Sequence, residues 1–142
     1  MSRQKKLHGL WNILIILTVI ICIIAFVVHY KNWTKVNGNH IQILSGIYYK
    51  KLPFSELDSI MMVPKIPAME RINGFSVKNR EKGVFIDSIS GSRTYVYVDD
   101  LRQPKIRLIY KDSLQLFLNF TDSVRTKDMY EFLSAKIDSI QE

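Results

Sequence analysis

The chain has 142 residues, with 20 Lys and Arg against 13 Asp and Glu, which gives a formal net charge of +7 at pH 7. Five of the basic residues and no acidic ones lie in residues 1–39, so the rest of the chain is close to neutral. This distribution argues against a nucleic-acid partner, because most of the excess charge lies where the anionic headgroups of a membrane account for it.

The first predicted element is a transmembrane helix over residues 10–28, which follows a basic flank at residues 1–9. No charged side chain interrupts this run, and as a helix it reaches about 28 Å, the thickness of the hydrocarbon core of a bilayer. Trp11 at one end, with Tyr30 and Trp33 at the other, marks the two membrane interfaces. A buried core helix would show a polar face, and this run has none. The sequence therefore predicts that the lipid bilayer is a partner.

A cleaved signal peptide is the alternative interpretation of this run. Its basic start suits a signal peptide, but the run exceeds the roughly 7–15 apolar residues of such a segment, and residues 27–30 lack a small-x-small cleavage pattern. We expect an uncleaved, single-pass anchor in the cytoplasmic membrane. Three basic residues precede the run, while Lys31 and Lys35 follow it. The positive-inside rule then favours a cytoplasmic N-terminus with the domain on the far side.

The chain beyond the anchor is expected to form a linker and one domain. Residues 29–39 contain one Gly and three Asn, which is typical of a short polar linker. Residues 40–142 are enough for one domain with a single hydrophobic core. The one cysteine, Cys22, lies in the anchor, so the domain is expected to hold no disulfide.

The domain is predicted to be mainly β with one helix at its C-terminal end. Alternating apolar residues and short turns predict an antiparallel sandwich or barrel of seven strands. These strands are expected at residues 41–49, 57–63, 72–77, 84–89, 94–98, 106–110 and 114–120. The pattern then changes to a helical period, with Thr126 as a cap and with Leu133 and Ile137 on one apolar stripe. We expect this helix to cover an open end of the sheet.

Three local features resemble a bacterial pleckstrin-homology-like (PH-like) domain family. They are Ser45–Tyr49 leading into Leu52–Leu57, Arg71–Phe75 followed by Lys82–Phe85, and Gly91–Val98 followed by Pro104–Ile109 and the helix after Thr126. The resemblance covers roughly residues 40–140. It implies a PH-like barrel of seven antiparallel strands capped by a helix, and a role in binding lipids, peptides or other proteins beside a membrane.

The residue types of common catalytic sites are missing from the predicted sheet. His8, His29 and His40 all precede it, and no His or Cys occurs in residues 41–142. A Ser–His or Cys–His nucleophile and a zinc site with the usual ligands are therefore excluded there. No glycine-rich phosphate loop occurs either. We predict no catalytic residue, no cofactor and no metal.

Three functions remain open. The preferred one is a binding or assembly module without catalysis, whose partner is another membrane or envelope protein. The first alternative is a domain that senses lipid headgroups through Lys50 and Lys51. The second is an enzyme that uses carboxylates alone, from Asp87, Asp99 or Asp100. Adjacent strand residues point in opposite directions, so we expect Asp99 and Asp100 to be exposed loop acids that solubilise a turn.

Overall fold

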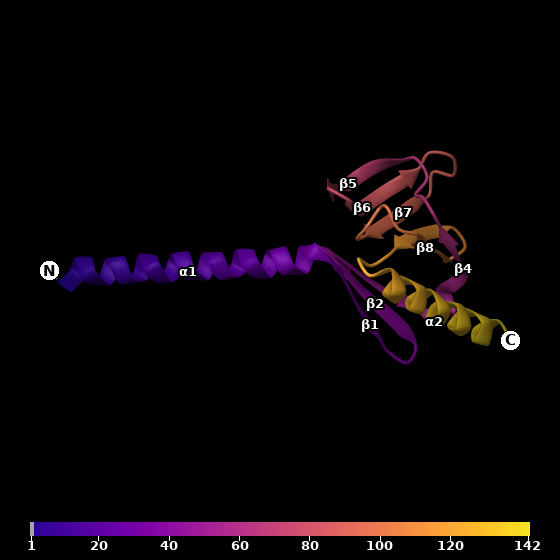
Figure 1. Cartoon of the computed structure of the whole chain (residues 1–142), viewed down its shortest axis with the longest axis horizontal. Coiled ribbons are helices and arrows are strands. Elements are labelled where there is room, and N and C mark those ends of the chain that lie inside the picture. The colour runs from indigo at the N-terminus through magenta and orange to yellow at the C-terminus, as the bar shows by residue number, and fades with distance from the viewer. Residues whose placement is uncertain (1) are drawn as a thin grey trace.

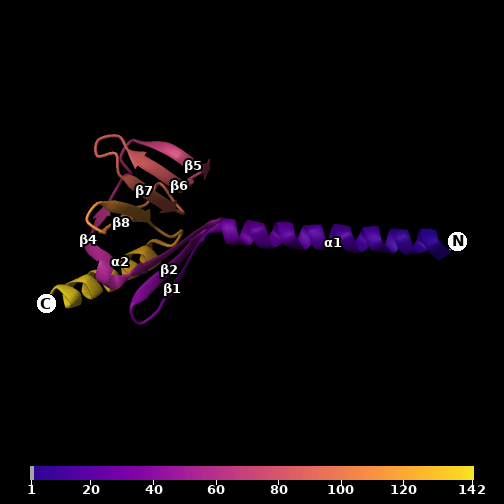
Figure 2. The same cartoon turned by 180° about the vertical axis from the view of Figure 1, so that it is seen from behind.

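Residues 2–142 are described by the computed structural model. The first element, α1 (Ser2–Tyr30), is one unbroken helix that projects away from the rest of the chain (Figure 1 and Figure 2). Its side chains from Gln4 to Val27 are all exposed. The segment Gln4–Tyr30 is long and apolar enough to cross a membrane, by length and composition. The helix contains the predicted span and extends beyond it at both ends.

The described residues hold nine strands in two sheets. The first sheet has the order β1-β2-β3 and consists of β1 (Asn32–Val36), β2 (His40–Ser45) and β3 (Tyr48–Pro53). A short 3-10 turn, η1 (Phe54–Glu56), leads to the second sheet, which has the order β4-β8-β9-β7-β6-β5. Its strands are β4 (Leu57–Val63), β5 (Met69–Val77), β6 (Arg80–Asp87), β7 (Arg93–Val98), β8 (Lys105–Tyr110) and β9 (Leu114–Leu118). The chain ends with α2 (Ser123–Gln141).

The mainly β fold with a C-terminal helix is confirmed. The prediction of seven antiparallel strands in a sandwich or barrel is wrong in the number of strands, in the direction of one pair and in closure as a barrel. Gly46 adopts a φ of 62°, which permits a tight turn that splits the expected strand 41–49 into β2 and β3. The expected linker, residues 29–39, instead contains the end of α1, strand β1 and the β1–β2 turn. β7 and β9 pair in parallel, because β9 is inserted between β7 and β8. The two sheets do not close into a barrel.

The main hydrophobic core lies between the two sheets and α2. It is built from buried side chains of β2, β3, β7, β8, β9 and α2, among them Ile41, Ile43, Leu108, Leu116 and Leu133. Each such side chain stabilises the fold by about 1.5–3 kcal/mol on full burial. The opposite face of the larger sheet has a smaller cluster of Phe85, Val96, Val98 and Phe117, against which Ile66 of the β4–β5 connection packs.

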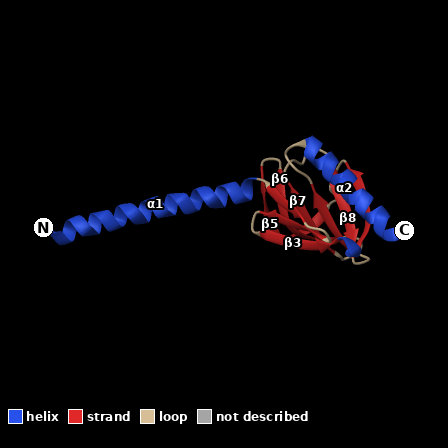
Figure 3. Ribbon diagram, turned by 90° about the horizontal axis from the view of Figure 1, so that it is seen from below, coloured by secondary structure: helices blue, strands red, loops and turns tan. Residues whose placement is uncertain are grey.

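α2 packs against β4, η1 and β8, and Figure 3 shows it along one side of the stacked strands. The expected cap, Thr126, is wrong as an N-cap. The cap is Asp122, whose carboxylate accepts a hydrogen bond from Val124 N at 2.9 Å. Thr126 is buried one turn further on, where its Oγ1 accepts a hydrogen bond from Phe120 N at 3.0 Å.

Candidate functional site

A buried polar junction joins α1 to the domain, and Asn32 lies at its centre. α1 ends at Tyr30 and β1 begins at Asn32. The Asn32 backbone N donates to both carboxylate oxygens of Asp99, at 3.1 and 2.9 Å. Its side-chain nitrogen donates to the carbonyl oxygens of Tyr97 at 2.6 Å and Asn119 at 2.8 Å. Ser45 Oγ donates to its side-chain oxygen. The first residue of β1 is thus attached to β2 and to the ends of β7 and β9.

Lys82 and Asp99 form an ion pair inside this junction. The Lys82 Nζ lies 3.0 Å from an Asp99 carboxylate oxygen, and the two side chains are 0% and 1% exposed. Burial lowers the pKa of Lys82 below its ordinary value, and the neighbouring Asp99 carboxylate opposes this shift. An isolated buried charge is costly, so each of the two charges requires the other.

Two cations of β6 hold the C-terminal end of α1. Lys82 Nζ lies 3.5 Å from the carbonyl oxygen of His29, and Arg80 Nε donates to the carbonyl oxygen of Tyr30 at 2.7 Å. The Arg80 guanidinium also lies 4.1 Å from the centre of the Tyr30 ring. The last carbonyls of a helix lack partners within the helix and carry partial negative charge. The end of α1 is therefore fixed to the sheet by hydrogen bonds and by charge.

Asn119 fixes the loop that crosses the end of β9. Its side-chain oxygen accepts from Asp99 N at 2.8 Å and from Asp100 N at 3.1 Å. Its side-chain nitrogen donates to the carbonyl oxygens of Asp100 at 2.7 Å and Pro104 at 3.3 Å. One amide thus satisfies four backbone groups of the loop between β7 and β8. This loop carries Asp99 into the junction.

The prediction that Asp99 and Asp100 are exposed loop acids is wrong, because both are buried, at 3% and 5% exposure. Asp100 accepts hydrogen bonds from the Arg102 side chain at 3.1 and 3.0 Å and from Arg102 N at 3.0 Å. These bonds lower the pKa of Asp100. Asp87 lies at the other end of β6, where it accepts from Ile89 N at 2.9 Å. The three acids are therefore not gathered in one site.

The structure also separates the two lysines proposed for headgroup contact. Lys51 is exposed, whereas Lys50 lies on the opposite face of β3 and is half-buried. The Lys50 Nζ is 3.5 Å from the ring centre of Tyr95 and 5.6 Å from that of Tyr110. Alternation along the strand explains the separation, because neighbouring residues point to opposite faces of a sheet.

The aromatic residues expected at the membrane interfaces are all exposed. Trp11 is 58% exposed near the N-terminal end of α1, and Tyr30 is 48% exposed at its C-terminal end. Trp33, on β1, is 40% exposed. The Lys31 Nζ lies 4.3 Å from the Trp33 ring centre. Tyr30, Lys31 and Trp33 therefore gather where α1 meets the domain.

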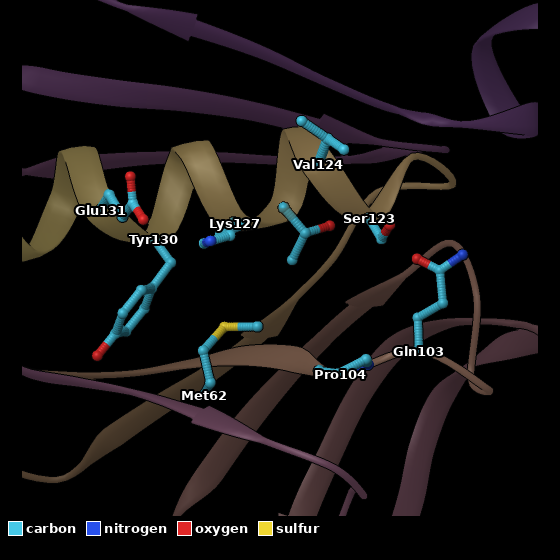
Figure 4. Close-up of a pocket in the computed structure, with 9 residues that line it drawn as sticks. Met62, Gln103, Pro104, Ser123, Val124, Lys127, Tyr130 and Glu131 are labelled. Carbon is cyan, nitrogen blue, oxygen red and sulfur yellow. The ribbon is translucent and has the colours of Figure 1, made fainter.

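Among the open recesses of the described residues, three lie on the domain or at its border with α1. One, of about 470 Å³, lies between the start of α2 and the ends of β4 and β8 (Figure 4), where Met62, Pro104, Val124 and Tyr130 form its apolar part. A second, also of about 470 Å³, lies beneath the β4–β5 connection. A third, of about 360 Å³, lies between the last turn of α1 and the β5–β6 hairpin.

Within residues 2–142 there is no group of three or more His, Cys, Asp or Glu side chains placed to hold a metal ion. No protein-family model, curated protein or solved structure matches the chain. The resemblance to the bacterial PH-like family therefore stays a prediction.

Of the junction residues, the sequence analysis singled out Asp99 alone, as a candidate acid, and it missed the roles of Asn32, Lys82 and Asn119. Asn119 gave one usable signal, because it interrupts the apolar run Leu116–Phe120 without ending it. A polar residue inside a buried run requires hydrogen-bond partners. Lys82 and Asn32 gave no such signal, since each lies in a polar stretch of sequence.

Proposed function

We propose that this chain is a single-pass membrane protein whose domain is a binding or assembly module and carries out no catalysis. The observation that carries this proposal is the buried junction of Asn32, Lys82 and Asp99, which fixes the domain to α1. A domain that is fixed on its anchor presents each of its surfaces at one height and one angle to the bilayer. A surface held at a fixed height and angle can recognise a neighbouring molecule.

The exposure of α1 supports its place in a membrane. Its apolar side chains are uncovered by the rest of the chain, and an exposed apolar surface of this extent marks contact with lipid or another protein. The contacts of Arg80 and Lys82 with the carbonyls of Tyr30 and His29 support an anchor that stays attached. Removal of the helix would leave these cations without those acceptors.

The short connection between α1 and β1 limits what the domain can reach. A domain of about 100 residues has a radius of gyration of about 13 Å, so its surfaces lie within about 40 Å of the bilayer. The proposed partner is therefore another membrane or envelope protein. The basic residues that precede the apolar run at residues 10–28 favour a cytoplasmic N-terminus, which would place the domain on the far side of the cytoplasmic membrane.

Site-specific photocrosslinking in native membranes tests this proposal. A photoreactive amino acid is placed singly at three exposed positions on different elements: Val36, Ile89 and Val124. We expect at least one position to give a discrete, light-dependent adduct with a second membrane-associated protein, while at least one other position gives none. That contrast separates a defined interface from random collision.

The carboxylate-enzyme alternative is tested on the same purified full-length protein. The protein is assayed against panels of esters, phosphoesters and glycosides, with Asp87→Asn as the variant, because Asp87, unlike Asp99 and Asp100, is not buried. Turnover that this variant abolishes, together with no adduct from any of the three positions, would overturn the proposed function.

A further inference from the structure

Two hairpin turns lie against the last turn of α1. At the β2–β3 turn, a Cβ on Gly46 would lie 2.7 Å from His29 Nδ1, so the turn backbone packs directly on the side chain of His29. At the β5–β6 hairpin, the Phe75 ring meets the His29 ring edge-on, with centres 5.9 Å apart. Figure 1 and Figure 3 show the β5–β6 hairpin on the side of the domain from which α1 leaves. This side faces the bilayer if α1 spans it.

The recess between α1 and the β5–β6 hairpin combines apolar and basic side chains. It has a volume of about 360 Å³, and the side chains that line it are Phe26, His29, Tyr30, Phe75, Val77, Lys78 and Arg80. Phe26 is 67% exposed and Val77 is 52% exposed. Large apolar side chains are exposed in this way where they contact lipid or a partner. The recess is continuous with the apolar surface of α1.

The rim of this recess carries two basic side chains, Lys78 and Arg80, that pair with no carboxylate within the described residues, although Arg80 Nε donates to the carbonyl oxygen of Tyr30. Lys78 is exposed at the tip of the hairpin, and neither Lys78 nor Arg80 belongs to any of the ion pairs there. The nearby acids are already occupied, since Asp99 pairs with Lys82 and Asp100 pairs with Arg102. The rim is therefore suited to an anion.

We propose that this recess binds the headgroup phosphate of an anionic phospholipid from the leaflet beside the domain. Lys78 and Arg80 face the phosphate, while Phe26 and Val77 contact the glycerol region and the first carbons of the acyl chains. Charge complementarity and continuity with α1 identify this occupant, because the recess combines the basic side chains Lys78 and Arg80 with Phe26, which belongs to the apolar surface of α1.

This inference rests on the proposed anchoring of α1, and it adds a lipid site that the proposed binding module does not require. It differs from headgroup contact through Lys50 and Lys51. Lys50 is held against the rings of Tyr95 and Tyr110, whereas Lys78 lies on the turn beside the end of α1.

Depth-dependent fluorescence quenching of the full chain in vesicles gives the first test. In a Cys22→Ser background, Val77→Cys carries an environment-sensitive dye, and Ser113→Cys in the β8–β9 turn serves as the control at the far end of the domain. We expect brominated phosphatidylcholine to quench the dye at position 77 and aqueous iodide to quench the dye at position 113.

Iodide quenching at both positions would overturn the inference. So would a dye at position 77 that is protected from iodide but unaffected by brominated lipid, because a protein would then cover the recess.

Lipid selectivity gives the second test. Spin-labelled phosphatidylglycerol and phosphatidylcholine are compared for the fraction immobilised by the full chain in mixed vesicles. We expect Lys78→Gln to lower the preference for phosphatidylglycerol by about fivefold, the contribution of one basic residue near an anionic surface. High salt should weaken the preference as well. Lys111→Gln is the matched control, because Lys111 is also an exposed turn lysine with positive φ, 48° against 54° for Lys78, and it should change the preference little.

The two proposals fail in different ways. Release of the chain from membranes by alkaline carbonate would overturn the anchoring and the lipid site together. A chain that resists carbonate but shows equal immobilisation of the two lipids would overturn the lipid site alone.

Discussion

The Nζ atom of Lys82 lies 3.0 Å from a carboxylate oxygen of Asp99, and neither side chain is more than 1% exposed. The two oxygens of the same carboxylate accept hydrogen bonds from the backbone N of Asn32. The Lys82 ammonium also lies 3.5 Å from the carbonyl oxygen of His29 in the last turn of α1. One buried charge pair therefore connects α1, β1 and the larger sheet.

Removal of one member of this pair should be strongly destabilising. Asp99→Asn leaves the Lys82 ammonium buried without its counter-charge, which typically costs about 3–5 kcal/mol. Urea unfolding of the full chain in detergent micelles measures the loss. The double variant Lys82→Met with Asp99→Asn should recover part of it, because the unpaired charge is then gone.

The matched control is Arg71→Gln, since the Arg71–Glu81 pair is 40% and 22% exposed, and its loss should cost less than about 1 kcal/mol. Additive effects of Lys82→Met and Asp99→Asn would contradict this account.

The amide of Asn119 should be equally hard to replace. Asn119→Ala leaves two backbone N–H groups and two carbonyls of the β7–β8 loop without their partner. Unsatisfied buried groups cost about 1–3 kcal/mol each, although relaxation of the loop reduces the sum, so we expect roughly 2–4 kcal/mol in total. Hydrogen exchange should accelerate at the amides of Asp99 and Asp100. Asn73→Ala, which removes an exposed amide bonded to Tyr48, is the control and should leave these amides unchanged.

Two facing glycines should prove necessary for the pairing of β5 with β6. Gly74 lies opposite Gly83 in the ladder, and a Cβ on Gly83 would overlap the carbonyl oxygen of Asn73. We expect Gly83→Ala to destabilise the domain by about 1–3 kcal/mol, because the strands must separate to admit a methyl group. Gly38→Ala is the comparison, since nothing lies within 4 Å of a Cβ there, and it should stay within about 0.5 kcal/mol of the parent chain. Equal melting temperatures for the two variants would refute the prediction.

Acid should remove the contribution of Asp100 to stability. Hydrogen bonds from Arg102 lower the pKa of Asp100 below its ordinary value of 3.8. A carboxyl group whose pKa is lowered by folding stabilises the folded state fully above its unfolded pKa, and this stabilisation is lost as the pH falls through the folded pKa. The difference in unfolding midpoint between the parent chain and Asp100→Asn should therefore be largest near neutral pH and should shrink below about pH 4. A difference that is constant down to pH 2 would contradict this assignment.

The sequence alone predicted those elements whose pattern of side chains lies within one continuous segment. Thr94–Val98 alternates β-branched and aromatic residues, and it forms β7 close to the predicted bounds. The helix was found for the same reason, since Leu133 and Ile137 recur at the helical period and are both buried.

What could not be predicted depends on contacts between distant segments. β1 has a polar sequence, and its strand geometry is imposed by its ladder with β2. The parallel pairing of β7 with β9 could not be predicted from either segment, because the same alternation of side chains fits a parallel and an antiparallel strand. Likewise, the meeting of Asn32 with Asp99 spans 67 positions of the chain. For this reason an exposed loop was predicted where the buried junction lies.

Because β9 lies between β7 and β8 in the larger sheet, this sheet can be completed only after β9 has been synthesised. Among the strands of the described residues, β9 follows all the others in the chain, and Asn119 follows β9 directly. α1 precedes these strands in the chain, so it is synthesised before them, and if it spans a membrane as we propose, it can insert while the domain is still incomplete. The junction between α1 and the domain can therefore form only after Asn119 has been synthesised. If α1 spans a membrane as we propose, a nascent chain that stops before residue 114 would be held there with no fixed orientation of its domain.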